Sequence, residues 1–133
     1  MSLQTIGVIG AGNIGASVIA DLVLHGLNVV AVDLTDAALD RARAEIVQTV
    51  RFAPLLAKEM PKLTREEVLA GIAFTTDLAA VAACGFVIEN VTEDWTIKEP
   101  VYRQLDKIMP PHVCFGANTS CIPIGRIADV TAR

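Results

Sequence analysis

The feature that most constrains the fold of this chain is the glycine-rich run GAGNIG at residues 10–15. It directly follows the apolar segment 5–9, which is typical of a strand, and directly precedes segment 14–24, which has the pattern of a helix stopped by Gly26. In such a place the first glycine permits a tight turn, the second leaves room for a pyrophosphate at the helix N-terminus, and the third lets helix and strand pack closely. The run therefore predicts a strand–turn–helix unit that binds a dinucleotide.

An acidic residue supports this interpretation and indicates which dinucleotide is bound. Asp33 ends the next strand-like segment, 27–32, at about the distance from the glycines where an acid that binds the adenosine ribose belongs. Its carboxylate would repel a 2′-phosphate, and residues 34–36 offer no arginine to bind one, so we expect NAD rather than NADP. The glycine run alone also fits FAD. The simpler alternative is a structural glycine turn with an Asp33 that only caps the following helix.

Strand-like and helix-like segments alternate along the whole chain, which predicts an α/β fold of the Rossmann type: a doubly wound, mostly parallel sheet with helices on both faces. The strands have continuous apolar runs, so both faces of the sheet should be buried. Further strands are expected at residues 72–75, 86–91 and 113–117. Further helices are expected from Asp36 to a break or kink at Pro54 and Pro61, at 64–69, after Asp77, along the stripe Val101, Leu105, Ile108 and Met109, and within 122–133.

Composition narrows the possible partners. With 133 residues, 53% hydrophobic and 20% charged, the chain fits one domain with a sizeable core. A net charge of -4 and 5% aromatic residues argue against nucleic acid and anionic membranes as partners. The three cysteines lack CxxC spacing, so we expect no disulfide framework, no metal site and a reducing, cytoplasmic location. No signal peptide and no apolar run long enough to span a bilayer is expected.

Polar residues follow two of the later strands, at the sheet edge where open α/β sheets bind ligands. Glu93 follows segment 86–91, and Asn118, Thr119 and Ser120 follow segment 113–117. Lys98 falls in the first turn of a helix, where the positive end of the helix dipole disfavours a cation by a few tenths of a kcal/mol. We therefore expect an anionic neighbour or a ligand beside Lys98.

Together these motifs resemble the NAD-binding domain of the 3-hydroxyacyl-CoA dehydrogenase family over the whole chain. The resemblance is carried by the glycine run with Asp33, by Thr75-Thr76-Asp77-Leu78, by the run from Ile88-Glu89 through Glu93 and Lys98 to Leu105, and by Asn118-Thr119-Ser120. It implies that Glu93 and Lys98 line the nicotinamide end of the cofactor and that Ser120 hydrogen-bonds the substrate oxygen. The simpler alternatives are a solvated Glu93–Lys98 ion pair and a helix cap at Ser120.

The residues expected in the site follow from the motifs and the resemblance. The expected catalytic residue is Ser120, no metal ligand is expected, and the expected cofactor-binding residues are Gly10, Gly12, Asn13, Ile14, Gly15, Asp33, Glu93, Lys98 and Asn118.

One element of the family pattern is missing from these residues. The family's general base is a histidine in a His-Phe-x-Asn-Pro segment, whereas this chain has only His25 and His112, at the end of the first helix and near the amino end of the last strand. Neither is expected to be catalytic. Residues 1–133 are therefore expected to be one NAD-binding domain, a fragment without the family's C-terminal helical domain, inactive alone and derived from a homodimeric parent.

The resemblance implies an NAD-dependent oxidoreductase of fatty acid metabolism that interconverts 3-hydroxyacyl and 3-oxoacyl thioesters. The thioester partner could be coenzyme A, whose arm the family binds with a basic helical segment; Arg51, Lys58, Lys62 and Arg65 lie in the matching region, although a solvated helical face is simpler. Two alternatives stay open: a dehydrogenase of hydroxyacyl groups on an acyl carrier protein for extender-unit synthesis, and a non-catalytic NAD-binding module.

Overall fold

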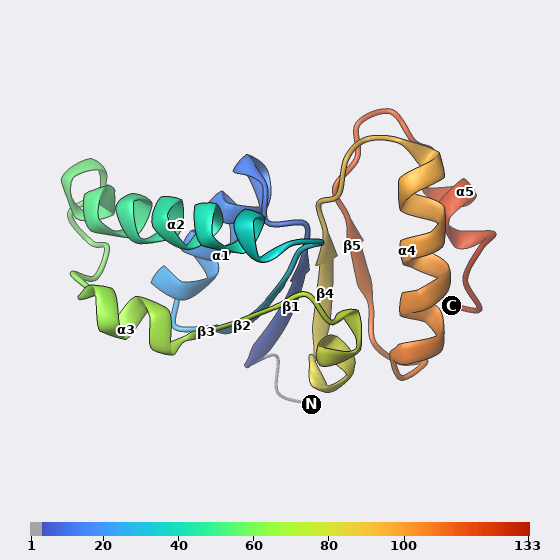
Figure 1. Ribbon diagram of the computed structural model, residues 1–133, viewed down its shortest axis with the longest axis horizontal. Helices are drawn as coiled ribbons and strands as arrows, with labels where there is room; N and C mark the ends of the chain where they lie inside the picture. Colours follow the sequence, from blue (N-terminus) through green and yellow to red (C-terminus); the bar gives the residue numbers. More distant parts are fainter. Residues whose placement is uncertain (1–3) are drawn as a thin grey trace.

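The computed structural model describes residues 4–133 and shows a five-stranded, fully parallel sheet with the strand order β3-β2-β1-β4-β5 (Figure 1). The strands are β1 (Thr5–Ile9), β2 (Asn28–Val32), β3 (Ile72–Thr75), β4 (Phe86–Glu89) and β5 (Phe115–Ala117). The helices are α1 (Asn13–Leu24), α2 (Asp36–Leu56), α3 (Arg65–Ala70), the 3₁₀ helix η1 (Leu78–Ala83), α4 (Trp95–Ile108) and α5 (Ile124–Ala128). The predicted Rossmann-type arrangement is confirmed.

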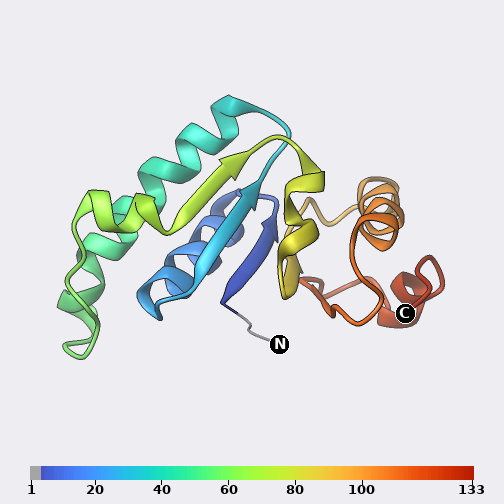
Figure 2. The same cartoon turned by 90° about the horizontal axis from the view of Figure 1, so that it is seen from below.

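The sheet separates two clusters of buried side chains, because successive strand residues point to opposite faces. On β1, Ile6 and Val8 belong to the cluster under α1 and α2, whereas Ile9 belongs to the cluster under η1, α4 and α5. Seen from below, α2 with α3 and α4 with α5 lie at opposite ends of the molecule (Figure 2). Both faces of the sheet are thus covered by helices, as the continuous apolar strands predict.

The topology places a crevice at the centre of the sheet. After β1 the chain proceeds to β2 on one side, and after β3 it crosses to β4 on the other side of β1. The loops that follow β1 and β4 therefore diverge at the carboxyl edge of these two neighbouring strands. Open α/β sheets bind their ligands at such a switch point.

Short-range signals predicted most element ends correctly. Gly26 follows α1 with φ of 77°, and α3 begins with the expected capping box, in which the Thr64 hydroxyl accepts from the Glu67 N–H and the Glu67 carboxylate accepts from the Thr64 N–H. The long helix was predicted to break or kink at Pro54 and Pro61; α2 continues past Pro54 and ends at Leu56, between the two prolines. Because Pro54 lies in the last turn, only one backbone bond is lost there.

Two predicted features needed correction near the carboxyl edge. Strand β4 ends at Glu89, two residues early, because its pairing with β5 stops at Glu89 and Ala117. The buried line of α4 is Lys98, Tyr102 and Leu105, whereas Val101 is only half-buried. A charged side chain therefore occupies a position on the inner face of α4. No helix within residues 4–133 is long and apolar enough to cross a membrane.

Candidate cofactor-binding site

The three glycines of the run 10–15 meet different surroundings. Gly10 has φ of 85°, and a Cβ there would lie 2.7 Å from the Asn90 carbonyl carbon, while a Cβ at Gly15 would lie 1.9 Å from the Gly10 carbonyl oxygen. A Cβ at Gly12 would meet no atom within 4 Å. Folding therefore requires Gly10 and Gly15 to lack a side chain, whereas at Gly12 the space is open for a bound group.

The N-terminus of α1 is suited to an anion. Gly12 is its N-cap and offers no side chain to bond the first helical N–H groups, and the first turn carries no acidic residue. The N–H groups of Asn13, Ile14 and Gly15 thus have no helical partner, and the helix dipole adds partial positive charge. A phosphate or pyrophosphate fits this end of the helix, with Gly12 leaving the approach free.

Asp33 joins the glycine loop to the end of β2. Its Oδ2 accepts from the Ala11 N–H at 2.8 Å, and its Oδ1 accepts from the Leu34 N–H at 2.7 Å. The alternative that Asp33 only caps the next helix is wrong, because Thr35 is the N-cap of α2. Beside Asp33 is a hollow of about 250 Å³, lined also by Ala11, Gly12, Asn13, Ala38, Arg41, Ala42 and Glu45.

Arg41 and Glu45 were not predicted to belong to the site. They reach the hollow because residues 38, 41, 42 and 45 share one face of α2, which begins just after Asp33. The helical spacing was the only available signal.

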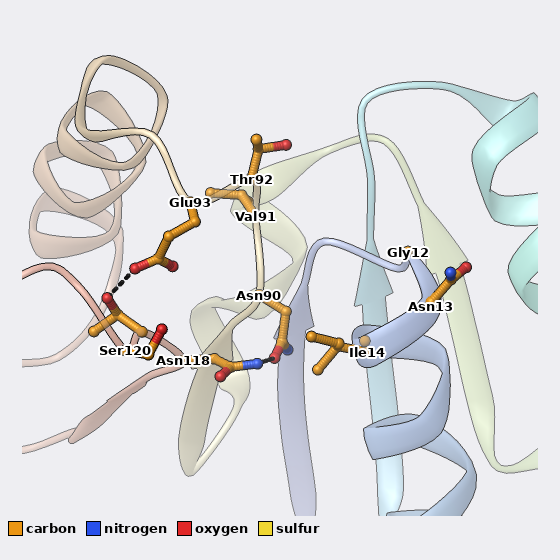
Figure 3. A pocket seen from close by; sticks show the side chains of 11 residues that line it. Gly12, Asn13, Ile14, Asn90, Val91, Thr92, Glu93, Asn118 and Ser120 are labelled. Atoms are coloured by element: carbon orange, nitrogen blue, oxygen red, sulfur yellow. Dashed lines mark hydrogen bonds between the residues drawn. The ribbon is translucent and has the colours of Figure 1, made fainter.

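A larger cavity of about 700 Å³ lies on the other side of the glycine loop (Figure 3). It is lined by Gly12, Asn13, Ile14, Gly15, Asn90, Val91, Thr92, Glu93, Asn118, Thr119 and Ser120. The Asn118 side-chain amide donates to the Asn90 side-chain oxygen at 2.8 Å, which joins the ends of β5 and β4. The structure thus brings Glu93, Asn118 and Ser120 together around one cavity, beside the N-terminus of α1.

Glu93 stands at the rim of this cavity as a carboxylate. It accepts a hydrogen bond from the Thr119 hydroxyl, and its Oε2 lies 3.5 Å from the Lys98 ammonium nitrogen. The Thr119 bond contributes most to lowering the pKa of Glu93 below its ordinary value. Desolvation opposes it, and the positive charge of Lys98 adds to the lowering. Glu93 therefore offers charged acceptor oxygens to a ligand in the cavity.

Lys98 does not line the cavity but contacts its wall from behind. Its side chain is 0% exposed, which contradicts the alternative of a solvated ion pair. Its ammonium donates to both Glu89 oxygens at 2.9 and 3.0 Å, to the Val91 carbonyl at 3.2 Å and to the Asn118 carbonyl at 3.3 Å. The expected anionic neighbour is thus confirmed, with Glu89 as the closest partner.

Glu89 and Tyr102 complete a buried group that the sequence analysis did not assign. Glu89 is 0% exposed and also accepts from the Val91 N–H at 2.6 Å and from the Tyr102 hydroxyl at 2.7 Å. Burial, then the hydrogen bond and the charge of Glu89, raise the pKa of Tyr102, so its hydroxyl stays a donor. We call Glu89, Lys98 and Tyr102 the buried triad. An acid inside a buried strand was the available signal, since buried charges need partners.

The remaining candidate residues are Ser120, His25 and His112. Ser120 is exposed at the cavity and does not cap α5, whose N-cap is Pro123. His25 contacts the Asp21 carbonyl oxygen at the end of α1, and His112 borders a separate hollow near Cys114. Within residues 4–133, no group of three or more His, Cys, Asp or Glu side chains is arranged to hold a metal ion.

Comparison with known proteins agrees with this geometry. Residues 5–133 match the family model "3-hydroxyacyl-CoA dehydrogenase, NAD binding domain". The chain is 36% identical over 129 residues to a probable 3-hydroxybutyryl-CoA dehydrogenase of Deinococcus radiodurans, covering 96% of this chain and 45% of that protein. The structure of (S)-3-hydroxybutyryl-CoA dehydrogenase from Ralstonia eutropha superposes with a TM-score of 0.87 at 36% identity, over 99% of this chain and 46% of the other.

A diketoreductase structure superposes with a TM-score of 0.91 at 26% identity, over 100% of this chain and 47% of the other. The chain therefore spans about half the length of the relatives it matches.

Proposed function

Since the chain belongs to the 3-hydroxyacyl-CoA dehydrogenase family, as its NAD-binding domain, we propose that it binds NAD across the two hollows beside the glycine loop. The observation that carries this proposal is the open space at Gly12, at an uncapped helix N-terminus, with a carboxylate on either side: Asp33 in the smaller hollow and Glu93 in the larger one. This arrangement fits a molecule with a central pyrophosphate and two ribose groups.

In this proposal each residue has a defined task. The N–H groups of the first turn of α1 bind the pyrophosphate, and Asp33 accepts from the hydroxyls of the adenosine ribose. Glu93 and Asn118 bind the nicotinamide half from the ends of β4 and β5. When bound, NAD supplies a hydride acceptor at its nicotinamide ring. Ser120, exposed at the cavity, binds the oxygen of the substrate carbon that is oxidised.

The parent enzyme, in this proposal, interconverts 3-hydroxyacyl and 3-oxoacyl thioesters, and residues 1–133 form its NAD-binding domain. Removing the hydroxyl proton of the substrate needs a general base. His25 and His112 line neither hollow beside the glycine loop, so we place the base outside this chain. The isolated chain is then expected to bind cofactor without turning over substrate.

The thioester carrier is proposed to be coenzyme A, bound near the junction of α2 and α3. Two hollows of about 380 and 400 Å³ lie there, and Arg51 borders both, with Lys62 at the first and Arg65 at the second. Titration of the parent enzyme with acetoacetyl-coenzyme A and with the same acyl group on an acyl carrier protein distinguishes the two carriers. Tighter binding of the carrier-protein form would contradict this assignment.

The cofactor assignment is tested by calorimetric titration of the purified chain with NADH and NADPH. We expect NADH to bind more tightly, and we expect Asp33→Asn to lower NADH affinity about tenfold, because a ribose then loses a charged acceptor. Asp36→Asn, which neutralises an exposed acid three residues further on, is the matched control and should leave the affinity unchanged. A folded chain that binds neither nucleotide would overturn the proposal.

A further inference from the structure

The buried triad connects the separate segments that form the wall of the larger cavity. The Lys98 ammonium bonds Glu89 at the end of β4, the Val91 carbonyl in the following loop and the Asn118 carbonyl after β5. These segments also supply most of the cavity lining, residues 90–93 and 118–120. The position of the Lys98 nitrogen therefore affects the geometry of the cavity, although no atom of its side chain is exposed.

Two carboxylates lie close to the Lys98 ammonium. Glu89, fully buried, offers both oxygens at 2.9 and 3.0 Å, and Glu93, with 37% of its side chain exposed, lies at 3.5 Å. An ammonium without solvent needs a close anion and filled hydrogen bonds. Glu89 meets this need from behind the wall, so Glu93 is left at the rim, where it is bonded to Thr119.

Tyr102 and the backbone in turn fix Glu89. The Tyr102 hydroxyl donates to Oε2, the Val91 N–H donates to Oε1, and the ammonium donates to both oxygens. The carboxylate thus accepts four hydrogen bonds from three donor groups, which leaves it a single orientation. In metal sites, removing a residue that hydrogen-bonds a metal-binding side chain commonly changes the affinity by about ten- to a hundredfold.

We propose that Glu89 and Tyr102 are positioning residues, which hold the Lys98 ammonium behind the cavity wall and thereby keep the Glu93 carboxylate turned to the cofactor. The link from Glu93 to affinity rests on the proposed function, whereas the link from Glu89 to Glu93 concerns the free chain alone. Without Glu89, the only carboxylate of residues 4–133 that remains within 3.5 Å of the ammonium is Glu93. The ammonium then draws Glu93 inward, away from the cavity.

The test follows the Glu93 carboxyl carbon by NMR in the free chain across a pH titration, with the signal assigned from Glu93→Gln. In Glu89→Gln the pKa of Glu93 falls below that of the unchanged chain, because the ammonium turns to it. In the double variant Glu89→Gln with Lys98→Met the pKa of Glu93 rises instead, because the cation is gone. A purely structural role of Glu89 would lower thermal stability and leave the pKa of Glu93 the same, which would overturn the proposal.

Calorimetry with NADH supplies the second readout. Glu89→Gln should weaken NADH about tenfold, and adding Glu93→Gln to it should weaken NADH no further, because both changes remove the same contact. If the double variant instead weakens NADH binding by the product of the two separate effects, the proposal is contradicted. Tyr102→Phe, which keeps both charges, should fold and weaken NADH two- to threefold, and it keeps the test valid if Glu89→Gln fails to fold. Glu99→Gln, on the outer side of α4, is the matched control and should change neither readout.

The two proposals fail separately. If the unchanged chain binds no NADH while the pKa of Glu93 responds to Glu89 as described, the cofactor assignment fails and the positioning role stands. If NADH binds and the pKa of Glu93 ignores Glu89, only the positioning role fails.

Discussion

The two sides of the site are built by different physical means. The smaller hollow is shaped by backbone geometry: glycines that permit a close approach, uncapped N–H groups of α1, and the carboxylate of Asp33 bonded to the glycine loop. The larger cavity is shaped by side-chain charge, through Glu93 at the rim and the buried triad behind it. Sterics make the first side rigid, whereas the second side depends on charges that must remain paired without water.

The largest expected effect comes from breaking the buried pair. Lys98→Met should lower the free energy of unfolding by about 3–5 kcal/mol, because Glu89 is left as a buried carboxylate without its cation. Urea unfolding measures the loss. On the same helix, Arg103→Met removes the exposed pair with Glu99 and should cost less than about 1 kcal/mol. Equal losses in the two variants would mean that the triad is not a charge-paired unit.

The glycine side should respond to volume rather than charge. Gly15→Ala should lower the free energy of unfolding by about 3 kcal/mol, because its Cβ would lie 1.9 Å from the Gly10 carbonyl oxygen, a backbone atom that cannot turn aside. Gly12→Ala is its matched partner, with no atom within 4 Å of the new methyl group. It should keep stability within about 1 kcal/mol and yet weaken NADH at least tenfold. An unchanged NADH affinity in Gly12→Ala would argue against a pyrophosphate at this helix end.

An alkaline titration examines the triad without cofactor. The pKa of Tyr102 is raised in the folded chain, so unfolding above the ordinary tyrosine pKa of about 10 releases a proton. The contribution of Tyr102 to stability is therefore complete below about pH 10 and is lost as the pH rises further, by about 1.4 kcal/mol per unit. Since the chain has 1 tyrosine, near-ultraviolet absorbance should show tyrosinate only on unfolding. In Tyr102→Phe the fall of stability above about pH 10 should become shallower by this amount, and a tyrosinate signal from folded protein would contradict the assignment.

The same contrast explains what could be predicted from the sequence. The glycine run, the capping box at Thr64 and the turn at Gly26 act over a few residues, so their local spacing was sufficient. The partners of Glu89 were not predictable in this way, because Lys98 and Tyr102 follow it by 9 and 13 positions and meet it only after β4 and α4 pack. A helical hydrophobic pattern predicts that a lysine lies on the solvent-facing side of its helix. Lys98 lies on the buried side of α4 instead, because its charge is paired there with Glu89.

Which residues belong to the candidate site was predicted better than how these residues are arranged. Glu93, Asn118 and Ser120 were expected at the carboxyl edge and do lie around one cavity. The hydrogen bond from Asn118 to Asn90 joins residues 28 positions apart, and no single-sequence pattern predicts such a pair. Arg41 was likewise missed, because it is an exposed helical residue whose place beside Asp33 follows from how α2 lies against the glycine loop.

The smallest effect should come from the rim of the larger cavity. Thr119→Val removes the hydroxyl that contributes most to the lowered pKa of Glu93, so this pKa should rise toward its ordinary value in the carboxyl NMR titration. Because the folded-state pKa of Glu93 is lowered, the stability that its charge contributes is present at neutral pH and is lost as the pH falls through that pKa. In Thr119→Val this loss should begin at higher pH, while Lys98 still holds part of the shift. If the pKa of Glu93 does not move, the buried triad alone determines the charge at the rim, through Lys98. The larger cavity then depends on buried charge still more clearly than the smaller hollow does.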